Sequence, residues 1–201
     1  MIRFDGATDT GYIDVYGDVL GTEFLTSSIE FLDHLVPGRL NDLSATNGAI
    51  VVGVHVERDV FEGLNGNQES GHEGRTGDLW LKSSDGPTRD GRDVLDVTAS
   101  GQNYPAALSS GSFWEALPGN ILADSDNRYV RFGGTSGAGP IVVGAVALML
   151  EVNPDLTAAE VKQILRDTAT ADEFTGTVPN EMWGYGKLNI VAAVEAAANA
   201  N

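Results

Sequence analysis

A serine in a glycine-rich turn is the residue of this chain best suited to covalent chemistry. Ser136 stands in the segment 134–140, Gly-Thr-Ser-Gly-Ala-Gly-Pro, directly before an apolar run. A helix that begins here would direct its unpaired N–H groups and the positive end of its dipole toward the serine, which stabilises an oxyanion beside it. The small neighbours would let a substrate backbone approach closely. The segment therefore predicts a serine nucleophile or, alternatively, an ordinary helix N-cap between turn glycines.

Serine chemistry also needs a base, because a serine hydroxyl is almost wholly protonated at neutral pH. The chain has no cysteine and three histidines, His34, His55 and His72. His72 lies in residues 62–78, a polar and glycine-rich segment that is expected to be a long loop. Loops that follow a parallel strand gather at the sheet edge where ligands bind. We predict His72 as the candidate base and His55 as the alternative, whereas His34 is expected to be a packing residue.

Acidic side chains that could orient such a histidine stand near both candidates in the sequence. They are Glu57, Asp59 and Glu73. A carboxylate behind a histidine holds the imidazole in the tautomer that accepts the serine proton. The two histidines could equally be solvated residues of a loop and a strand end. No residue is assigned to an oxyanion hole.

The hydrophobic pattern predicts the elements that must position these groups. Residues 48–54 form a β-branched run typical of a strand covered on both faces, and shorter strands are predicted at 79–83 and 94–98. Residues 141–150 are apolar all round, which predicts a helix buried in the interior. Gly144 within that helix is expected to mark a close contact that a larger side chain would disrupt.

Two more helices are predicted toward the C-terminus. Thr157 and Glu160 form a capping box at the start of an amphipathic helix. Its expected inward residues are Val161, Ile164 and Leu165, and its expected outward residues are Lys162, Arg166 and Asp167. An alanine-rich run over 189–198 predicts the last helix. The first forty-five residues are less regular and are expected to be β-rich, with a strand at 12–16 and a helical turn within 27–35.

Composition limits the class of protein and its partners. The 201 residues, of which 42% are hydrophobic, predict a single globular domain over 1–201. A formal net charge of −17 would repel phosphate backbones and anionic membrane surfaces, so neither nucleic acid nor a membrane is expected as partner. The start carries no apolar run typical of a signal peptide, and 141–150 is too short to span a bilayer, which predicts a soluble chain.

Several motifs, in order, resemble the subtilisin-like serine peptidases. The segment 134–140 is similar to that family's nucleophile motif, Gly-Thr-Ser-x-Ala-x-Pro before a long apolar helix. Residues 83–92, Ser-Ser-Asp-Gly-Pro-Thr-Arg-Asp-Gly-Arg, resemble a second segment of the family, which residues 96–101 continue. Three further matches in order and spacing, to the family's Val-Gly-Ala strand and its closing helices, are residues 51–54, 153–157 and 184–189.

The resemblance covers about residues 46–198 and only the second half of a usual catalytic domain of that family. It implies an α/β fold of three layers, with a mainly parallel sheet and a buried central helix, in other words a partial subtilisin-like fold. Residues 1–45 would then be a divergent N-terminal segment and residues 46–198 the subtilisin-like C-terminal half. The family's aspartate and histidine motifs and its oxyanion-hole asparagine have no counterpart in this sequence.

By this resemblance the chain is expected to be a serine hydrolase, an esterase, a peptidase or both, with an acyl-enzyme on Ser136. Simple esters need less help with their leaving group than peptides, so esterase activity is the easier of the two. The alternative is a truncated or degenerate subtilisin-like domain without catalysis of its own, acting as a fragment or a binding module. A third reading, an acidic module that recognises a cationic or glycan partner, rests on charge alone.

The expected partners are a small ester or peptide substrate and further copies of the chain. Forty-five N-terminal residues are too few to cover the sheet edge and helix face that a subtilisin-like half would leave open, which favours a homo-oligomer. No cofactor or metal site is predicted. Calcium is the alternative, because the family often binds it and the acidic runs 85–93 and 124–127 offer oxygen ligands, although without EF-hand spacing. The family is usually secreted, but the compartment of this chain is not predicted, since a lack of cysteine leaves it open.

Overall fold

The computed structural model describes residues 40, 42–69, 74–88, 90–123 and 125–200. They belong to a unit that spans Pro37–Asn201 and is separate from the unit Met1–Val36. The strand expected at 12–16, the helical turn expected within 27–35, and the residues His34, His72 and Glu73 lie outside the described residues.

Two parallel strands form the centre of the described fold. Strand β1 (Val52–Val56) pairs with β4 (Val97–Gln102), with Val54 opposite Ala99 and His55 opposite Ser100. The strands predicted at 48–54 and 94–98 are thus present, each displaced by a few residues toward the C-terminus. A short 3-10 helix, η1 (Asp42–Ala45), precedes β1 in the chain.

The strand predicted at 79–83 is wrong. Leu79 forms one isolated bridge with His55, and the chain turns at residues 81–82. Ser83 then meets β1 through its side chain, because its hydroxyl accepts a hydrogen bond of 3.0 Å from the N–H of Val54. This side-chain hydrogen bond therefore takes the place of the backbone hydrogen bonds that a strand over 79–83 would form.

The loop expected over residues 62–78 contains a hairpin instead. Strand β2 (Val60–Gly63) pairs antiparallel with β3 (Gly66–Glu69) across the two-residue turn Leu64-Asn65. Gly66 has a φ of +107°, which a side chain would disfavour, and an Asn-Gly step of this kind is a strong hairpin signal. The prediction of an irregular loop is therefore wrong for the residues of this hairpin, because it did not take the Asn-Gly step into account.

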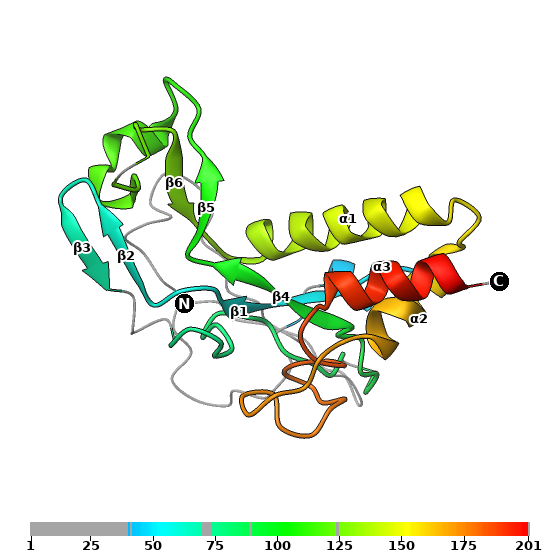
Figure 1. Ribbon diagram of the computed structural model, residues 1–201. Coiled ribbons are helices and arrows are strands. Elements are labelled where there is room, and N and C mark those ends of the chain that lie inside the picture. The colour runs from blue at the N-terminus through cyan, green and yellow to red at the C-terminus, as the bar shows by residue number, and fades with distance from the viewer. Residues whose placement is uncertain (1–39, 41, 70–73, 89, 124, 201) are drawn as a thin grey trace, which may run out of the picture. The chain divides into compact units, whose positions relative to one another are not determined.

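A second hairpin lies between β4 and the serine motif. Strand β5 (Tyr104–Ala107) pairs antiparallel with β6 (Tyr129–Phe132). The chain between them carries two short 3-10 helices, η3 (Phe113–Ala116) and η4 (Pro118–Asn120), drawn in green in Figure 1. This hairpin leads directly into the turn that bears Ser136.

Three α-helices complete the described unit. They are α1 (Thr135–Val152), α2 (Ala158–Asp167) and α3 (Ile190–Asn199). Helix α1 begins six residues before the predicted apolar run, because its small first residues carry no apolar periodicity. The capping box of α2 is confirmed, since the Glu160 N–H donates to the Thr157 hydroxyl and the Thr157 N–H donates to the Glu160 carboxylate at 2.7 Å.

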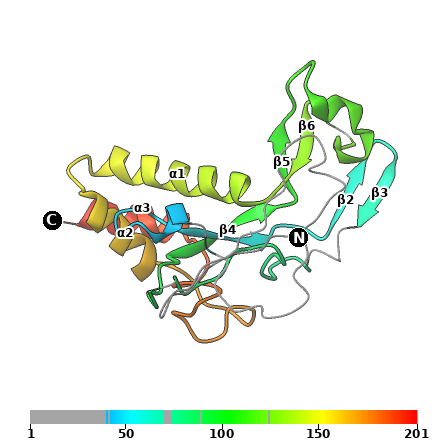
Figure 2. The same ribbon diagram turned by 180° about the vertical axis from the view of Figure 1, so that it is seen from behind.

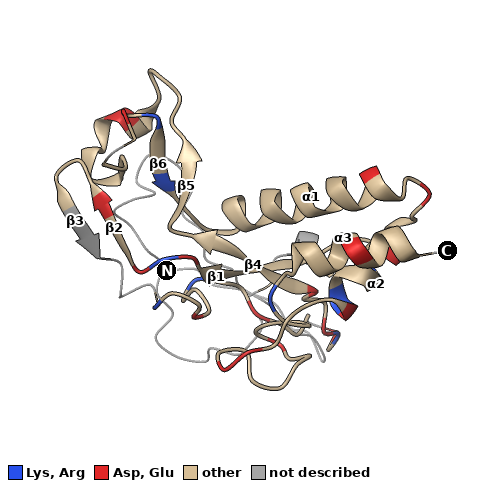
Figure 3. Ribbon diagram, in the orientation of Figure 1, with Lys and Arg blue, Asp and Glu red and all other residues tan. Residues whose placement is uncertain are grey.

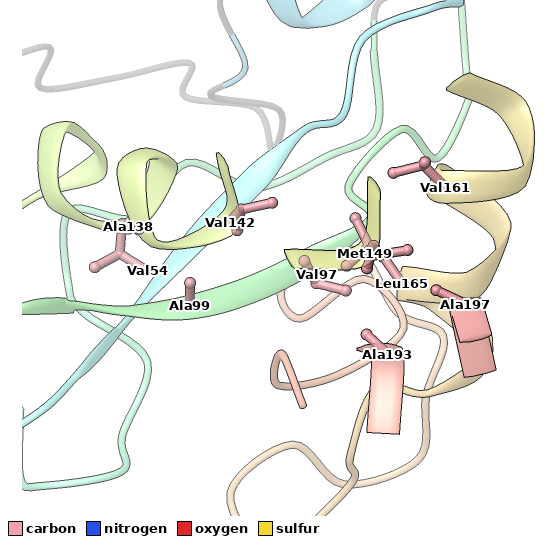
Figure 4. Close-up of a cluster of buried hydrophobic side chains, with 10 residues drawn as sticks. All are labelled: Val54, Val97, Ala99, Ala138, Val142, Met149, Val161, Leu165, Ala193 and Ala197. Atoms are coloured by element: carbon pink, nitrogen blue, oxygen red, sulfur yellow. The ribbon is translucent and has the colours of Figure 1, made fainter. Parts of the chain in front are cut away.

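Helix α1 crosses one face of the β1–β4 pair, with its amino end near the carboxyl ends of the two strands (Figures 1 and 2). The buried core fills the space between them and continues between α1, α2 and α3 (Figure 4). Its residues are Val54, Val97, Ala99, Ala138, Val142, Met149, Val161, Leu165, Ala193 and Ala197. The described chain is therefore an α/β structure whose core is organised around α1.

Helix α1 is buried along one side only, not all round. Its buried residues recur about once per turn as a single stripe, Gly137, Ala138, Val142, Ala145 and Met149. On the other side Val143 is 68% exposed and Leu148 and Val152 are each 46% exposed. The expected close contact at Gly144 is wrong, since a Cβ there would meet nothing within 4 Å.

The length of α1 also changes the argument about membranes. The helix has 18 residues rather than the ten of the apolar run, and by length and composition it could cross a bilayer. The exclusion of a span on the basis of length is therefore wrong. A helix of a protein core also packs an apolar stripe on neighbouring strands, as α1 does here. Packing in the core therefore explains the apolar composition of α1 as well as a membrane span would.

Helix α2 differs from its prediction in two charged residues. Lys162 and Arg166 do not face outward but converge on Asp96, whose side chain is fully buried just before β4. Lys162 Nζ lies 3.1 Å from Oδ2 of Asp96, and the Val51 N–H donates to the same oxygen at 2.7 Å. A buried carboxylate is costly unless it is paired and hydrogen-bonded, so two cations turn inward to meet it.

Candidate active site

Ser136 is the second residue of α1, and its side chain is exposed. The preceding Gly134 is the N-cap, with φ 89° and ψ −173°, a conformation that favours glycine. The N–H groups of Gly137 and Ala138 donate to the Gly134 carbonyl at 2.9 and 3.2 Å. The N–H groups of Thr135 and Ser136 have no hydrogen-bond partner in the part of the chain that the structure describes. The positive end of α1 is therefore free to meet an anion beside the serine hydroxyl.

Close backbone contact holds this turn against the end of β4. A Cβ on Gly101 would lie 2.6 Å from the Cβ of Ala138 and 2.9 Å from the carbonyl oxygen of Gly134. A Cβ on Gly133 would overlap the side-chain amide of Gln102. Glycine at both positions lets the carboxyl end of β4 and the start of α1 approach to within contact distance, which fixes where Ser136 stands.

Aromatic rings flank the turn on two sides. A Cβ on Gly134 would lie 3.5 Å from Cη2 of Trp80, and a Cβ on Gly137 would overlap the ring of Tyr104. The indole N–H of Trp80 is buried and has no hydrogen-bond partner among the described residues. Burial raises the pKa of Tyr104, so its hydroxyl stays protonated at neutral pH and can only donate or accept as a neutral group.

His55 lies on the other side of the parallel pair from Ser136. Val54 and Ala99 pack with Ala138 beneath α1, and side chains alternate along a strand, so His55 faces away from α1. Its Nδ1 lies 3.3 Å from the Thr98 hydroxyl, and its ring centroid lies 6.4 Å from that of Trp183. The structure therefore does not bring His55 to Ser136.

The environment of His55 also keeps it neutral. Burial, followed by the positive charge of Lys187, lowers the pKa of His55 from 6.5 to about 4, against the opposing pull of Glu57 and Asp172. A histidine of this kind is uncharged at neutral pH and packs as part of the layer below the sheet. His55 is thus a packing residue rather than the alternative base.

Two of the three expected orienting acids are held by hydroxyl groups. The Ser100 hydroxyl donates to the Glu57 carboxylate. Asp59 accepts from the Thr76 hydroxyl at 3.0 Å, and this hydrogen bond is the main reason that the pKa of Asp59 is lowered. Neither contact is with a histidine. The third acid, Glu73, and the predicted base, His72, lie outside the described residues, so their relation to Ser136 remains a prediction.

The described acidic residues do not assemble a metal site. In residues 40, 42–69, 74–88, 90–123 and 125–200, no three His, Asp or Glu side chains gather where they could share an ion. In the run 85–93, Asp90 accepts from the Thr88 hydroxyl and from Arg92 Nε at 2.7 Å. Its carboxylate is therefore used within the turn, as ordinary turn-forming acids are.

Sequence reasoning missed the aromatic residues around the serine. Trp80 and Tyr104 precede Ser136 by more than thirty residues, and neither stands in a motif that suggests chemistry. The only signal is indirect, since glycine at 134 and 137 implies that something else occupies the space a side chain would fill. The identity of the occupant follows from the fold alone.

With the geometry established, comparison with known proteins identifies the family. A sequence profile of the subtilase family matches residues 38–186. The chain belongs to the subtilase family. The serine motif, the Gly101 contact and the long helix α1 all lie within the matched residues.

Individual relatives of this subtilase are proteases. Serine protease AprX of Bacillus subtilis is 37% identical over 107 residues, which are 53% of this chain and 23% of AprX. A calcium-dependent protease of Trichormus variabilis is 39% identical over 82 residues, 38% of this chain and 12% of that protein. This chain thus spans less than a quarter of the length of these two relatives.

A solved structure confirms the fold class. The CspB protease of Clostridium perfringens superposes with a TM-score of 0.57 at 23% identity, covering 85% of this chain and 31% of the CspB chain. The described α/β unit, with its parallel strands and central helix, is therefore a part of a subtilisin-like fold.

Proposed function

We propose that this subtilase is a serine hydrolase that cleaves peptide or ester bonds through an acyl-enzyme on Ser136. One observation carries the proposal. The exposed hydroxyl stands on the second residue of an 18-residue helix whose first two N–H groups are unpaired among the described residues. Membership of a family whose named relatives are serine proteases supports the same assignment.

The proposed reaction uses groups at the start of α1. The Ser136 Oγ attacks the substrate carbonyl carbon, an Oγ–C bond forms, and the carbonyl π electrons move to its oxygen. The Ser136 N–H would donate to that oxyanion, since it already points out of the helix end. The hydroxyl proton passes to the base and then to the departing alcohol or amine as its bond to carbon breaks. Water cleaves the acyl ester in the second half of the reaction.

His72 is the proposed base. The chain that follows it is anchored at the carboxyl end of β1, where the Gly77 N–H donates to the Val56 carbonyl and the Val56 N–H donates to the Asp78 carbonyl, both at 2.9 Å. The same edge of the parallel pair holds Gly101, which contacts the nucleophile turn. His72 precedes this anchored segment by only a few residues, which supports its assignment as the base.

Esters are the first substrates to test, because an alcohol leaves more readily than an amine when proton transfer is weak. The alternative is a subtilase domain without catalysis of its own, serving as a fragment or a binding module. That alternative is favoured by one observation: the single histidine among the described residues, His55, lies on the far side of the sheet from Ser136.

Labelling with a fluorophosphonate, followed by intact mass, separates the two functions. In the reaction a bond forms between the Ser136 Oγ and phosphorus, fluoride departs, and the hydroxyl proton is released. We expect one adduct per chain, none in Ser136→Ala, and an unchanged adduct in Ser110→Ala, which removes another exposed serine. An adduct that persists in Ser136→Ala, or no adduct in the parent chain, would contradict the proposed nucleophile.

We propose a mechanism that needs no cofactor, with calcium as the structural alternative. A matched relative is named a calcium-dependent protease, whereas no trio of ligating side chains gathers in the described part of this chain. Thermal unfolding with calcium and with a chelator tests this. Equal unfolding temperatures support the metal-free proposal, and a rise with calcium would show a stabilising site.

We further propose that the exposed side of α1 pairs with a second copy of the chain. With a net charge of −17, two copies can meet only where charge is sparse. Figure 3 shows α1 almost free of charged residues, with Glu151 near its C-terminal end, and Val143 is 68% exposed there. A stable dimer would bury about 1,200 Å² or more in total.

Light scattering after size exclusion, in moderate salt, measures this association. We expect a dimer for the parent chain, a monomer for Val143→Lys, and a dimer for Gln163→Lys, which adds the same charge on an exposed position of α2. A monomeric parent chain at micromolar concentration would refute the pairing.

A further inference from the structure

A cavity lies at the amino ends of β1 and β4, the edge of the parallel pair opposite the nucleophile turn. Its volume is about 390 Å³, and its wall comes from the segments that precede the two strands and from α2. We call it the amino-edge cavity. The lining residues that matter for its chemistry are Asn47, Arg92, Asp93, Lys162 and Arg166.

The amino-edge cavity gathers positive charge in an acidic protein. Three of the twelve Lys and Arg side chains line it, namely Arg92, Lys162 and Arg166. The Lys162 and Arg166 side chains are only 18% and 21% exposed. A cation that is largely removed from water is costly unless acids accompany it. The number of acids in contact with these cations therefore decides what the cavity can bind.

One carboxylate is shared by two of the three cations. Lys162 and Arg166 both contact Asp96, whose side chain is fully buried. Arg92 is already paired, since its Nε lies 2.7 Å from the Asp90 carboxylate. Asp93 on the wall forms no ion pair with these cations in the described part of the chain. Lys162 and Arg166 together thus carry one positive charge more than the acid that they contact.

Two lining residues also retain unused N–H groups. Arg166 contacts Asp96 through Nε and Nη2, and its Nη1 forms no hydrogen bond with the described residues. The Asn47 carbonyl oxygen accepts from Arg92 Nη1 at 2.6 Å, which leaves the Asn47 amide nitrogen as a donor. A guanidinium fork matches the geometry of carboxylate and phosphate oxygens. Charge and donors together therefore favour an oxyanion.

We propose that the amino-edge cavity is a binding site for an oxyanion, the carboxylate or phosphate group of a small molecule. The anion would balance the second cation on Asp96 and would join α2 to the segments before β1 and β4. Since one water molecule takes about 30 Å³ of liquid volume, the cavity has room for an organic remainder as well. The site is separate from Ser136 and does not depend on its proposed function.

The net charge of the chain does not prevent such binding. A charge of −17 repels anions at long range, but at moderate ionic strength charges more than about 10 Å apart are largely screened. The cations that line the cavity then dominate the local field. Binding is therefore expected to be measurable in moderate salt and weaker at low ionic strength.

Thermal unfolding of the full chain tests the site with inorganic phosphate, acetate and chloride as their sodium salts at equal ionic strength. We expect phosphate or acetate at tens of millimolar to raise the unfolding temperature by at least about 2 °C relative to chloride. In Arg92→Gln this rise should fall by half or more. In Arg128→Gln, which removes an exposed arginine outside the cavity, the rise should persist. Each variant is compared with itself in chloride, so a change in its own stability does not affect the result.

The outcomes decide both the site and the class of its ligand. A rise with acetate alone assigns a carboxylate, and a rise with phosphate alone assigns a phosphate group. Equal unfolding temperatures in the three salts, or a rise of the same size in Arg92→Gln, would overturn the site, because the latter is a general salt effect. Titration of the parent chain, followed through the NMR signals of the Asn47 side-chain amide, gives a second readout. A saturable shift supports the site, and no saturation at tens of millimolar anion counts against it.

Discussion

Arg166 holds one oxygen of Asp96 with two of its nitrogens, since Nε and Nη2 each lie 2.6 Å from Oδ1. The carboxylate is fully buried just before β4, and the guanidinium group also stacks 4.7 Å from the ring of Tyr185. One charged contact thus ties helix α2, strand β4 and the segment that follows α2. A serine carried on α1 depends on that arrangement, because α1 packs on the same strand.

Removal of the Asp96 charge is expected to destabilise the protein strongly. Asp96→Asn leaves Lys162 and Arg166 facing a neutral group, and breaking a buried ion pair from one side costs about 3–5 kcal/mol. Urea unfolding measures the loss. Asp155→Asn, at an exposed position, is the matched control and should change the free energy of unfolding by less than about 0.5 kcal/mol. Equal effects of the two variants would show that the buried pair contributes no special stability.

Two glycine substitutions are expected to have opposite effects. Gly101→Ala places a Cβ 2.6 Å from Ala138 and 2.7 Å from its backbone nitrogen, which should cost about 1–3 kcal/mol and slow labelling of Ser136. Gly144→Ala fills open space on α1 and should stabilise by about 0.5–1 kcal/mol through helix propensity. Thermal unfolding of both variants and labelling of Gly101→Ala measure these effects. A Gly101→Ala chain that is as stable and as reactive as the parent chain would contradict the close contact between Gly101 and the nucleophile turn.

His55 makes the stability of the protein depend on pH. Its pKa is lowered to about 4 in the folded state from 6.5, so the unfolded chain takes up the proton first as the pH falls. Above pH 6.5 His55 is mostly neutral in both the folded and the unfolded chain, so it does not lower the free energy of unfolding. Between about pH 6.5 and pH 4 its protonation in the unfolded chain should lower the free energy of unfolding by up to about 3 kcal/mol.

The measurement compares urea unfolding of the parent chain and of His55→Gln at about pH 7 and about pH 4.5. Because carboxylates titrate in the same range, the informative quantity is the difference between the two proteins. The parent chain should lose more stability on acidification. A difference that does not change with pH would mean that His55 titrates normally in the folded state.

Turnover should distinguish His72 from His55. If His72 is the base, His72→Ala lowers kcat for a p-nitrophenyl ester by about 100-fold or more, because general-base catalysis is lost. His55→Gln should leave kcat unchanged at neutral pH, since His55 lies on the opposite face of the sheet. Equal kcat values for His72→Ala and the parent chain would remove His72 from the mechanism.

Local patterns predicted the elements whose residues interact with their near neighbours in the chain. The capping box at Thr157 and the apolar run within α1 are examples, because helix signals lie within a few residues of one another. The nucleophile motif likewise indicated Ser136 at a helix start.

Contacts between distant residues escaped prediction. The inward turn of Lys162 and Arg166 depends on Asp96, about seventy residues away. The spacing of charged residues along α2 does not indicate that contact. The open side of α1 was also missed, because an apolar helix has the same composition whether its second face is covered or not. The position of His55 below the sheet required the register of β1 against β4, which fixes the face on which each side chain lies.

The shared space of Tyr104 and Gly137 has an evolutionary consequence. The Tyr104 ring of the hairpin fills the space beside Gly137. Related subtilases that carry a bulkier residue at the position of Gly137 are therefore expected to carry a smaller residue at the position of Tyr104. The two sites should therefore change together rather than independently. Tyr104→Ala should make Gly137→Ala less harmful in this chain, although a Cβ at 137 would still lie 3.0 Å from the carbonyl oxygen of Gly101. Lineages would then change the packing beside the serine in paired steps, with the hairpin and the residue after the serine inherited as one unit.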